Sequence, residues 1–174
     1  MSAKGWLLSI RGRTHVAVGA RELVYVLPEE PEIHGVPLAP APTPGVIVWE
    51  NRVVPLIDVA LRLGMADEGT GNLTTTLAGM HYFVAIVAFA GDDLLDVGVE
   101  LGALILTKVP EQVEVSDHQG RELPPEFEPH AELFASCFEH PELGAVPILD
   151  LTRLFASSGY RHERAGAHAW MSVQ

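Results

Sequence analysis

The sequence has little cysteine and no long hydrophobic run. Its single cysteine, Cys137, excludes an internal disulfide and favours a reducing compartment. The longest apolar run, Phe83–Ala90, is too short to span a bilayer, and the N-terminus shows no apolar segment typical of a signal peptide. We therefore expect a soluble, cytoplasmic protein.

Positive charge is also scarce. The chain has 11 Lys and Arg against 23 Asp and Glu, which gives a formal net charge of −12. Such a surface repels phosphate backbones and anionic lipid headgroups, so we expect neither nucleic-acid binding nor membrane insertion. The charge suits solubility, or a partner that carries basic side chains.

Motifs of catalysis are missing as well. The sequence contains no phosphate-binding loop, no Gly-x-Ser-x-Gly elbow and no His-Glu-x-x-His pair. Ser116, Asp117 and His118 are adjacent, but the groups of a catalytic triad meet through the fold and not through adjacency. We expect no enzymatic activity and no cofactor.

One group of residues could hold a metal. Cys137 and His140 are three residues apart, with His130 and Glu139 nearby, and zinc accepts these ligand types. Side chains alternate along a strand, so Cys137 and Glu139 would share one face and His140 would start on the other. Cys137 packing as a small hydrophobe explains the same residues. The rival hypothesis is a small metal- or ligand-binding β-barrel protein that uses Cys137, His130 and His140.

A short block occurs twice. Val54-Pro55-Leu56-Ile57-Asp58 returns as Val146-Pro147-Ile148-Leu149-Asp150, and each copy runs into a short segment with helical character. Upstream, Val16–Val24 resembles Val97–Ile105. A pattern used twice suggests one unit built twice. We predict an all-β chain of two small barrels with about five strands each, and short helices.

Local patterns place the elements of this fold. The predicted strands are Trp6–Ile10, His15–Val18, Leu23–Leu27, Val46–Trp49, Arg52–Pro55, Tyr82–Phe89, Leu94–Val99, Leu104–Val109, Gln112–Val115, Leu133–Glu139 and Ala145–Leu149. Glu50-Asn51 predicts a tight hairpin, and Asp58 and Asp150 are placed to cap short helices. Trp49 could meet a partner, but large aromatic side chains mostly fill interiors, so we expect a core position.

The domain organisation follows from the same reading. We expect a single domain over residues 1–174, with approximate halves 14–65 and 80–158 and a loosely ordered tail over 159–174. Six prolines in Pro28–Pro44 favour an extended connection, and Ala66–Thr76 is rich in glycine and polar residues, as in a linker.

The first copy resembles a known family. Gly45-Val46 and Val53–Asp58, preceded by a proline-rich stretch, are similar to the CheW family of chemotaxis coupling proteins. That family has approximately Gly-Val-x-Asn-Leu-Arg-Gly-x-x-x-Pro-x-x-Asp followed by a short helix. Val97–Val99 and the block from Val146 add to the likeness, which covers roughly residues 14–157.

The resemblance implies a fold and a function. It implies two five-stranded SH3-like β-barrels and a non-enzymatic adaptor. Such an adaptor links the cytoplasmic tips of methyl-accepting chemoreceptors to the regulatory domain of a CheA-type histidine kinase. Relatives serve type IV pilus systems and twitching motility. Receptors bind in the groove between the barrels, and the kinase docks on a barrel end.

The resemblance also implies contact residues. It places partner contacts at Val48, Trp49, Glu50, Asn51, Arg52, Val54, Asp58, Val97 and Val99. Where the family has Asn-Leu-Arg-Gly, this chain has Val48-Trp49-Glu50-Asn51, so the arginine is replaced by Glu50. An acidic residue there favours a basic partner and disfavours a partner built for arginine. A further possibility is a diverged relative whose partner lies outside chemotaxis.

Overall fold

The computed structural model describes residues 1–11, 13–37, 45–65, 77, 79–91 and 98–156. Within these residues, ten strands form two five-stranded sheets, with four short helices beside them. The predicted all-β class and the two five-stranded units are therefore confirmed. The predicted tail over 159–174 and the predicted linker over 66–76 lie outside the described residues.

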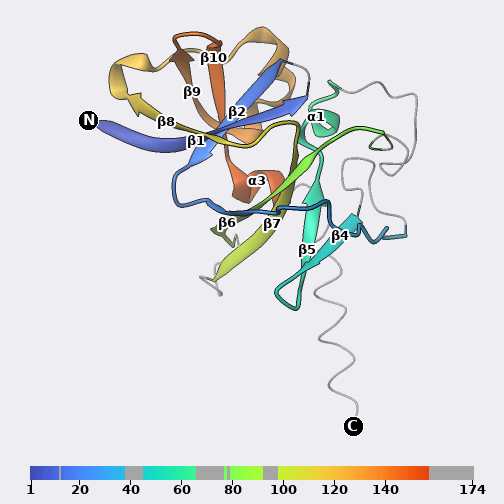
Figure 1. The fold of residues 1–174 in the computed structure, drawn as a ribbon. Coiled ribbons are helices and arrows are strands. Elements are labelled where there is room, and N and C mark those ends of the chain that lie inside the picture. The colour runs from blue at the N-terminus through green and yellow to red at the C-terminus, as the bar shows by residue number, and fades with distance from the viewer. Residues whose placement is uncertain (12, 38–44, 66–76, 78, 92–97, 157–174) are drawn as a thin grey trace.

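The first sheet has the strand order β8 (Glu111–Ser116), β1 (Ser2–Arg11), β2 (Thr14–Gly19), β10 (Gly144–Leu149), β9 (Phe134–His140). The second sheet has the order β3 (Leu23–Val26), β6 (Phe83–Ala90), β7 (Val99–Leu106), β5 (Arg52–Ile57), β4 (Gly45–Trp49). The helices are α1 (Val59–Arg62), η1 (Asp117–Gln119), η2 (Pro125–Leu133) and α3 (Leu151–Ala156). Figure 1 shows the first sheet above the second, with α3 between them.

The two sheets follow one plan. The repeated blocks fall in β5 and β10, and each of these strands lies between an antiparallel hairpin partner and a parallel neighbour. The strands of the first sheet, taken in the order β8, β9, β10, β1, β2, occupy the same positions in their sheet as β3, β4, β5, β6 and β7 occupy in the second. The sheets are therefore related by a circular permutation, with β3 to β7 inserted between β2 and β8.

This arrangement differs from the predicted halves, 14–65 and 80–158. The first sheet takes two strands from the start of the chain and three from its end, joined where Ala17 of β2 meets Ile148 of β10. The second sheet is continuous in sequence and spans both predicted halves. The repeated block marks one place in each sheet, so it reveals the duplication without showing where each sheet begins.

Strand β7 also differs from the prediction of two strands, Leu94–Val99 and Leu104–Val109. The described chain forms one strand, Val99–Leu106, which pairs along its whole length with β6, and residues 94–97 of the first predicted strand lie outside the described residues. Gly102, which falls in the gap between the two predicted strands, lies inside β7 and leaves room for the ring of Phe155 on α3. Any side chain at that position would overlap this ring, so the glycine marks a close approach and not a turn.

The main hydrophobic core joins the two sheets. It contains Leu8 and Val16 from the first sheet, Leu104 from the second, and Val59 and Phe155 from the two α-helices. A second core lies inside the second sheet, and a smaller one lies in the first. Since the principal core takes residues from both sheets, the sheets form one packed body.

Candidate functional site

The hairpin between β4 and β5 forms as predicted. Glu50 and Asn51 have φ angles of 49° and 60°, and Trp49 pairs with Arg52 across them. Two successive residues with positive φ are the geometry of the tight turn that matches the twist of a hairpin. Glu50, Asn51 and Arg52 are exposed at its tip. The hairpin thus presents a carboxylate, an amide and a guanidinium together.

Two valines on the outer face of this hairpin are exposed. Val48 pairs with Val53, and their exposed fractions are 58% and 69%. The next pair, Ile47 and Val54, points inward and is fully buried. Strand side chains alternate between faces, so this alternation separates core from surface. An exposed pair of β-branched side chains on a hairpin at the sheet edge is typical of a contact surface.

Trp49 links this hairpin to the other edge of the sheet. Its ring stacks on Tyr25 of β3, with the centroids 6.2 Å apart and the planes at 29°. β3 and β4 are the two edge strands, so the second sheet curls until its edges approach each other. Trp49 packs partly on the second core and is partly exposed, while Tyr25 is 48% exposed. We call Tyr25, Val48, Trp49, Glu50, Asn51, Arg52 and Val53 the hairpin surface.

Two predicted contact residues do not belong to this surface. Val54 and Asp58 are each only 1% exposed, so neither is accessible to a partner. Val54 lies in the second core because it alternates with Val53 along β5. The exposed valine of β5 is the preceding residue, Val53, which was not among the expected contacts. Strand alternation from the hairpin turn was the signal that could have identified Val53.

Asp58 instead joins the two sheets. Its carboxylate accepts a hydrogen bond from the Arg11 guanidinium of β1 at 2.7 Å, and the Arg11 side chain is only 19% exposed. The other carboxylate oxygen accepts from the backbone N–H of Leu61 at 3.2 Å, which caps α1 as predicted. Burying both charges is tolerated because each has a hydrogen-bonded partner.

The last two predicted contacts lie at the start of β7. Val97 is outside the described residues, and Val99 is 69% exposed. β7 runs parallel to β5, with Ala103 opposite Leu56. Following this register back along both strands brings Val99 level with Arg52, at the same end of the sheet as the hairpin tip.

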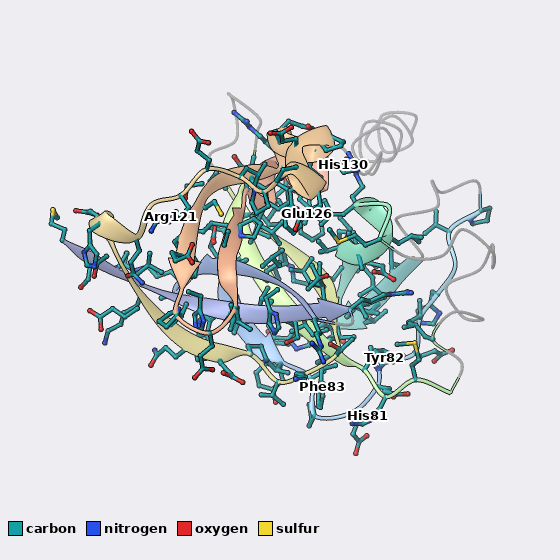
Figure 2. The ribbon with its side chains drawn as sticks, turned by 90° about the horizontal axis from the view of Figure 1, so that it is seen from above. His81, Tyr82, Phe83, Arg121, Glu126 and His130 are labelled. Atoms are coloured by element: carbon teal, nitrogen blue, oxygen red, sulfur yellow. The ribbon has the colours of Figure 1, made fainter. Side chains whose placement is uncertain are left out.

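The residues of the rival metal hypothesis do not come together. Among the described residues, no group of three or more His, Cys, Asp or Glu is arranged to hold a metal ion. Cys137 is buried in β9, where loss of solvent raises the pKa of its thiol. His140 Nδ1 accepts from the backbone N–H of Glu142 at 3.2 Å. His130 lies on η2, well away from His81 and Tyr82 (Figure 2).

No helix among the described residues is both long and apolar enough to cross a membrane. Comparison with curated proteins found no match. Among solved structures, the chain is similar to the scaffolding protein TtCheW from Thermoanaerobacter tengcongensis, with a TM-score of 0.64 and 16% sequence identity. The similarity covers 89% of this chain and 88% of that one.

A model of the CheW-like domain matches residues 4–159, almost the whole chain. The predicted resemblance is thereby confirmed, and so is the absence of an enzymatic role, because this family consists of non-enzymatic scaffold proteins. The chain therefore belongs to the CheW-like family of chemotaxis scaffold and adaptor proteins.

Proposed function

We propose that the protein is a cytoplasmic adaptor that joins the tips of chemoreceptors to the regulatory domain of a CheA-type histidine kinase. The observation that carries this proposal is the match of the CheW-like domain across residues 4–159. The hairpin surface is a contact area of the adaptor. Its exposed valine pair supports this role, because burying apolar side chains is the main favourable term in protein association.

Two residues at the tip define what this surface accepts. Glu50 stands where the family has arginine, and Arg52 lies opposite Trp49 across the turn. A partner that contacts Glu50 needs a basic group or a hydrogen-bond donor opposite it. The reversed charge is the reason to test receptors and kinases of type IV pilus systems beside those of chemotaxis.

The direct test measures binding of the purified protein to kinase regulatory domains and receptor tips encoded in the same genome. We expect micromolar or tighter binding to at least one of each, on the order of −8 kcal/mol. Failure to bind any kinase regulatory domain or receptor tip would contradict the adaptor role.

A charge on the exposed valine tests the contact area. We expect Val53→Asp to weaken binding of the partner at least tenfold, because a carboxylate would replace an apolar contact. Val109→Asp is the matched control, since Val109 is 58% exposed and lies outside the hairpin surface. Equal binding by the two variants would place the contact elsewhere. Thermal unfolding confirms that both variants fold.

A further inference from the structure

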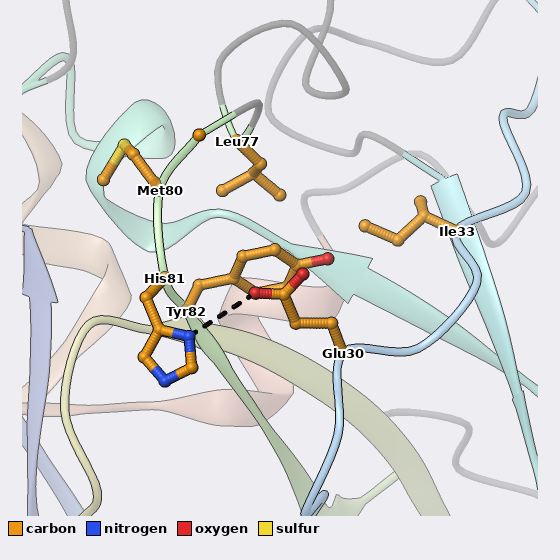
Figure 3. Close-up of a pocket in the computed structure, with 7 residues that line it drawn as sticks. Glu30, Ile33, Leu77, Met80, His81 and Tyr82 are labelled. Carbon is orange, nitrogen blue, oxygen red and sulfur yellow. Dashed lines mark ion pairs between the residues drawn. The ribbon is translucent and has the colours of Figure 1, made fainter.

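A concave site, separate from the hairpin surface, lies at the other end of β4. It is an open pocket of about 420 Å³ where the chain enters β6. Ile33 and Leu77 line it together with Met80, His81 and Tyr82, and Glu30 lies at its mouth (Figure 3). His34 bridges Val46 at the start of β4, whereas the hairpin tip follows the end of β4. The pocket and the tip are therefore separate sites.

The floor of the pocket is apolar. Leu77 and Tyr82 are 7% and 8% exposed and belong to the second core, and Ile33 packs against that core. Met80 is 40% exposed at the rim, and its unbranched thioether adapts to the shape of a neighbour. A ligand that enters this pocket must bring apolar atoms to the floor.

The mouth of the pocket is acidic. Among the described residues that line the pocket, Glu30 is the one carboxylate, and it lies beside the Tyr82 ring (Figure 3). Burial, and then the charge of Glu30, raises the pKa of the Tyr82 hydroxyl. The phenol stays protonated at neutral pH and adds no charge. Glu30 therefore sets the electrostatic preference of the site.

The histidine in the lining leaves this carboxylate accessible. His81 Nδ1 pairs with Glu30 Oε1 at 3.7 Å, which is too long for a hydrogen bond, and the Glu30 side chain is still 46% exposed (Figure 3). Glu29 and Glu32 are exposed on the same segment, and the whole chain carries a net charge of −12. These charges attract a cation and repel an anion.

An apolar floor below a carboxylate suits a ligand with an aliphatic stem and a cationic end. Lysine and arginine have this composition, because their methylene groups pack on apolar surface while the charged head stays near water. We propose that this pocket receives a lysine or arginine side chain of a partner protein, with the stem over Leu77 and Tyr82 and the cation at Glu30. The site does not depend on the partner being a kinase or a receptor.

A titration of the protein with a blocked single amino acid as the ligand tests the pocket directly. The full-length protein carries ¹³C-methyl methionine, so Met80 reports on the pocket, and Met1, Met65 and Met171 serve as internal references. The probe is N-acetyl-arginine-N-methylamide, and the matched probe is the corresponding citrulline compound, which has nearly the same shape without the charge. We expect a saturable shift of the Met80 methyl signal, at least fivefold weaker binding of citrulline, and little movement of the references.

Two variants locate the charge that matters. We expect Glu30→Gln to weaken arginine binding at least fivefold, and Glu29→Gln, the control on the adjacent residue, to change it less than twofold. Three outcomes would overturn the proposal: no saturable Met80 shift, equal binding of arginine and citrulline, or equal losses in both variants. The last would mean general attraction to an acidic surface. None of these outcomes bears on kinase or receptor binding, so this test is independent of the adaptor assay.

Discussion

Asp58 and Asp150 end the two copies of the repeated block, and both cap the helix that follows. Asp58 is buried and also pairs with Arg11 of the other sheet at 2.7 Å. Asp150 is 27% exposed and pairs with Arg153, three residues along its own helix, at 3.4 Å. The aspartate side chain thus joins the two sheets in one copy, whereas in the other its carboxylate contacts only the helix that it caps.

The difference follows from what surrounds each aspartate. β5 and β10 hold equivalent places in their sheets, so the strand and the cap are alike in both copies. Arg11 ends β1, and its guanidinium reaches the end of β5. In the second copy, the Arg153 side chain is 63% exposed. A local motif therefore fixes its own backbone and cap, but its packed neighbours decide whether the charge bears on stability.

The largest expected effect is the loss of Asp58. We expect Asp58→Ala to lower the free energy of unfolding by about 3–5 kcal/mol, because it leaves the mostly buried guanidinium of Arg11 unpaired. Urea unfolding measures the change. Asp58→Asn keeps a cap acceptor but removes the charge. We expect it to lower the free energy of unfolding by most of the amount that Asp58→Ala does.

The double variant Arg11→Met/Asp58→Asn removes both charges, and we expect it to recover stability relative to Asp58→Asn. A helix cap alone contributes about 1 kcal/mol. If Asp58→Ala lowered the free energy of unfolding by less than this, the ion pair would not make the two copies differ in stability.

A smaller loss of stability is expected where α3, the helix that follows the second copy, packs on the second sheet. Phe155 fills the space over Gly102 and stacks on Phe89, with the centroids 4.7 Å apart and the planes at 8°. We expect Gly102→Ala to lower the free energy of unfolding by about 1–3 kcal/mol through overpacking. Adding Phe155→Leu should restore part of the loss. A double variant less stable than Gly102→Ala would contradict this steric explanation.

Loss of the second aspartate should cost less again. We expect Asp150→Ala to lower the free energy of unfolding by about 1 kcal/mol, because it removes a helix cap and an exposed ion pair. Asp150→Asn keeps a cap acceptor and serves as the control, with a smaller loss. If Asp150→Ala proved as harmful as Asp58→Ala under the same urea assay, the two copies would be energetically equivalent.

The smallest expected effect on stability concerns the residues that pair with the proline of each repeated block. Cys137 pairs with Pro147 in the second copy, and Val46 pairs with Pro55 in the first. Burial raises the pKa of the Cys137 thiol. The folded state therefore holds this proton more tightly, and its contribution is complete below the unfolded pKa and is lost as pH rises through the folded pKa.

Between pH 8 and 10, we expect the wild-type free energy of unfolding to fall further than that of Cys137→Val. The thiol proton accounts for the direction of this difference, because valine has no group that titrates. Parallel pH profiles of the two proteins would show that the thiol does not titrate differently on folding.

A comparison of the hairpin tips tests the functional side. Glu50 lies at the β4–β5 tip, and Glu142 lies in the β9–β10 turn, the equivalent hairpin of the first sheet. We expect Glu50→Arg to change the affinity of the adaptor for its partner by more than tenfold, about 1.4 kcal/mol. Glu142→Arg makes the same charge change and should have little effect. No change for Glu50→Arg would place the tip outside the interface.

Local features were predictable from the sequence. Asparagine tolerates positive φ, so Glu50-Asn51 identified the hairpin, and a short polar side chain before a helix identified the caps at Asp58 and Asp150. Of the expected contact residues, Val48 to Arg52 lie at the hairpin, with Trp49 partly buried against the core, and their contact with a partner stays a prediction. The exposure of Val53 could have been predicted from the alternation along β5.

Contacts between distant segments were not predictable. The Arg11–Asp58 pair joins residues 47 positions apart, and the pocket brings Glu30 beside Tyr82. Gly102 was misread for the same reason, because the ring that needs its space comes from α3. No pattern within a few residues of these positions records what will pack against them.

The sequence by itself determined most of the strands, the hairpin turn and the helix caps, because each depends on residues within a few positions of one another. The repeated block also revealed the duplication. Only the tertiary structure decided which strands share a sheet, since β1 pairs with β8 at Ser2 and Ser116, across the whole insertion of β3 to β7. It also decided which copy of the block joins the sheets. Burial and the partner of a charge are properties of packing, and packing brings together segments that are far apart in the chain.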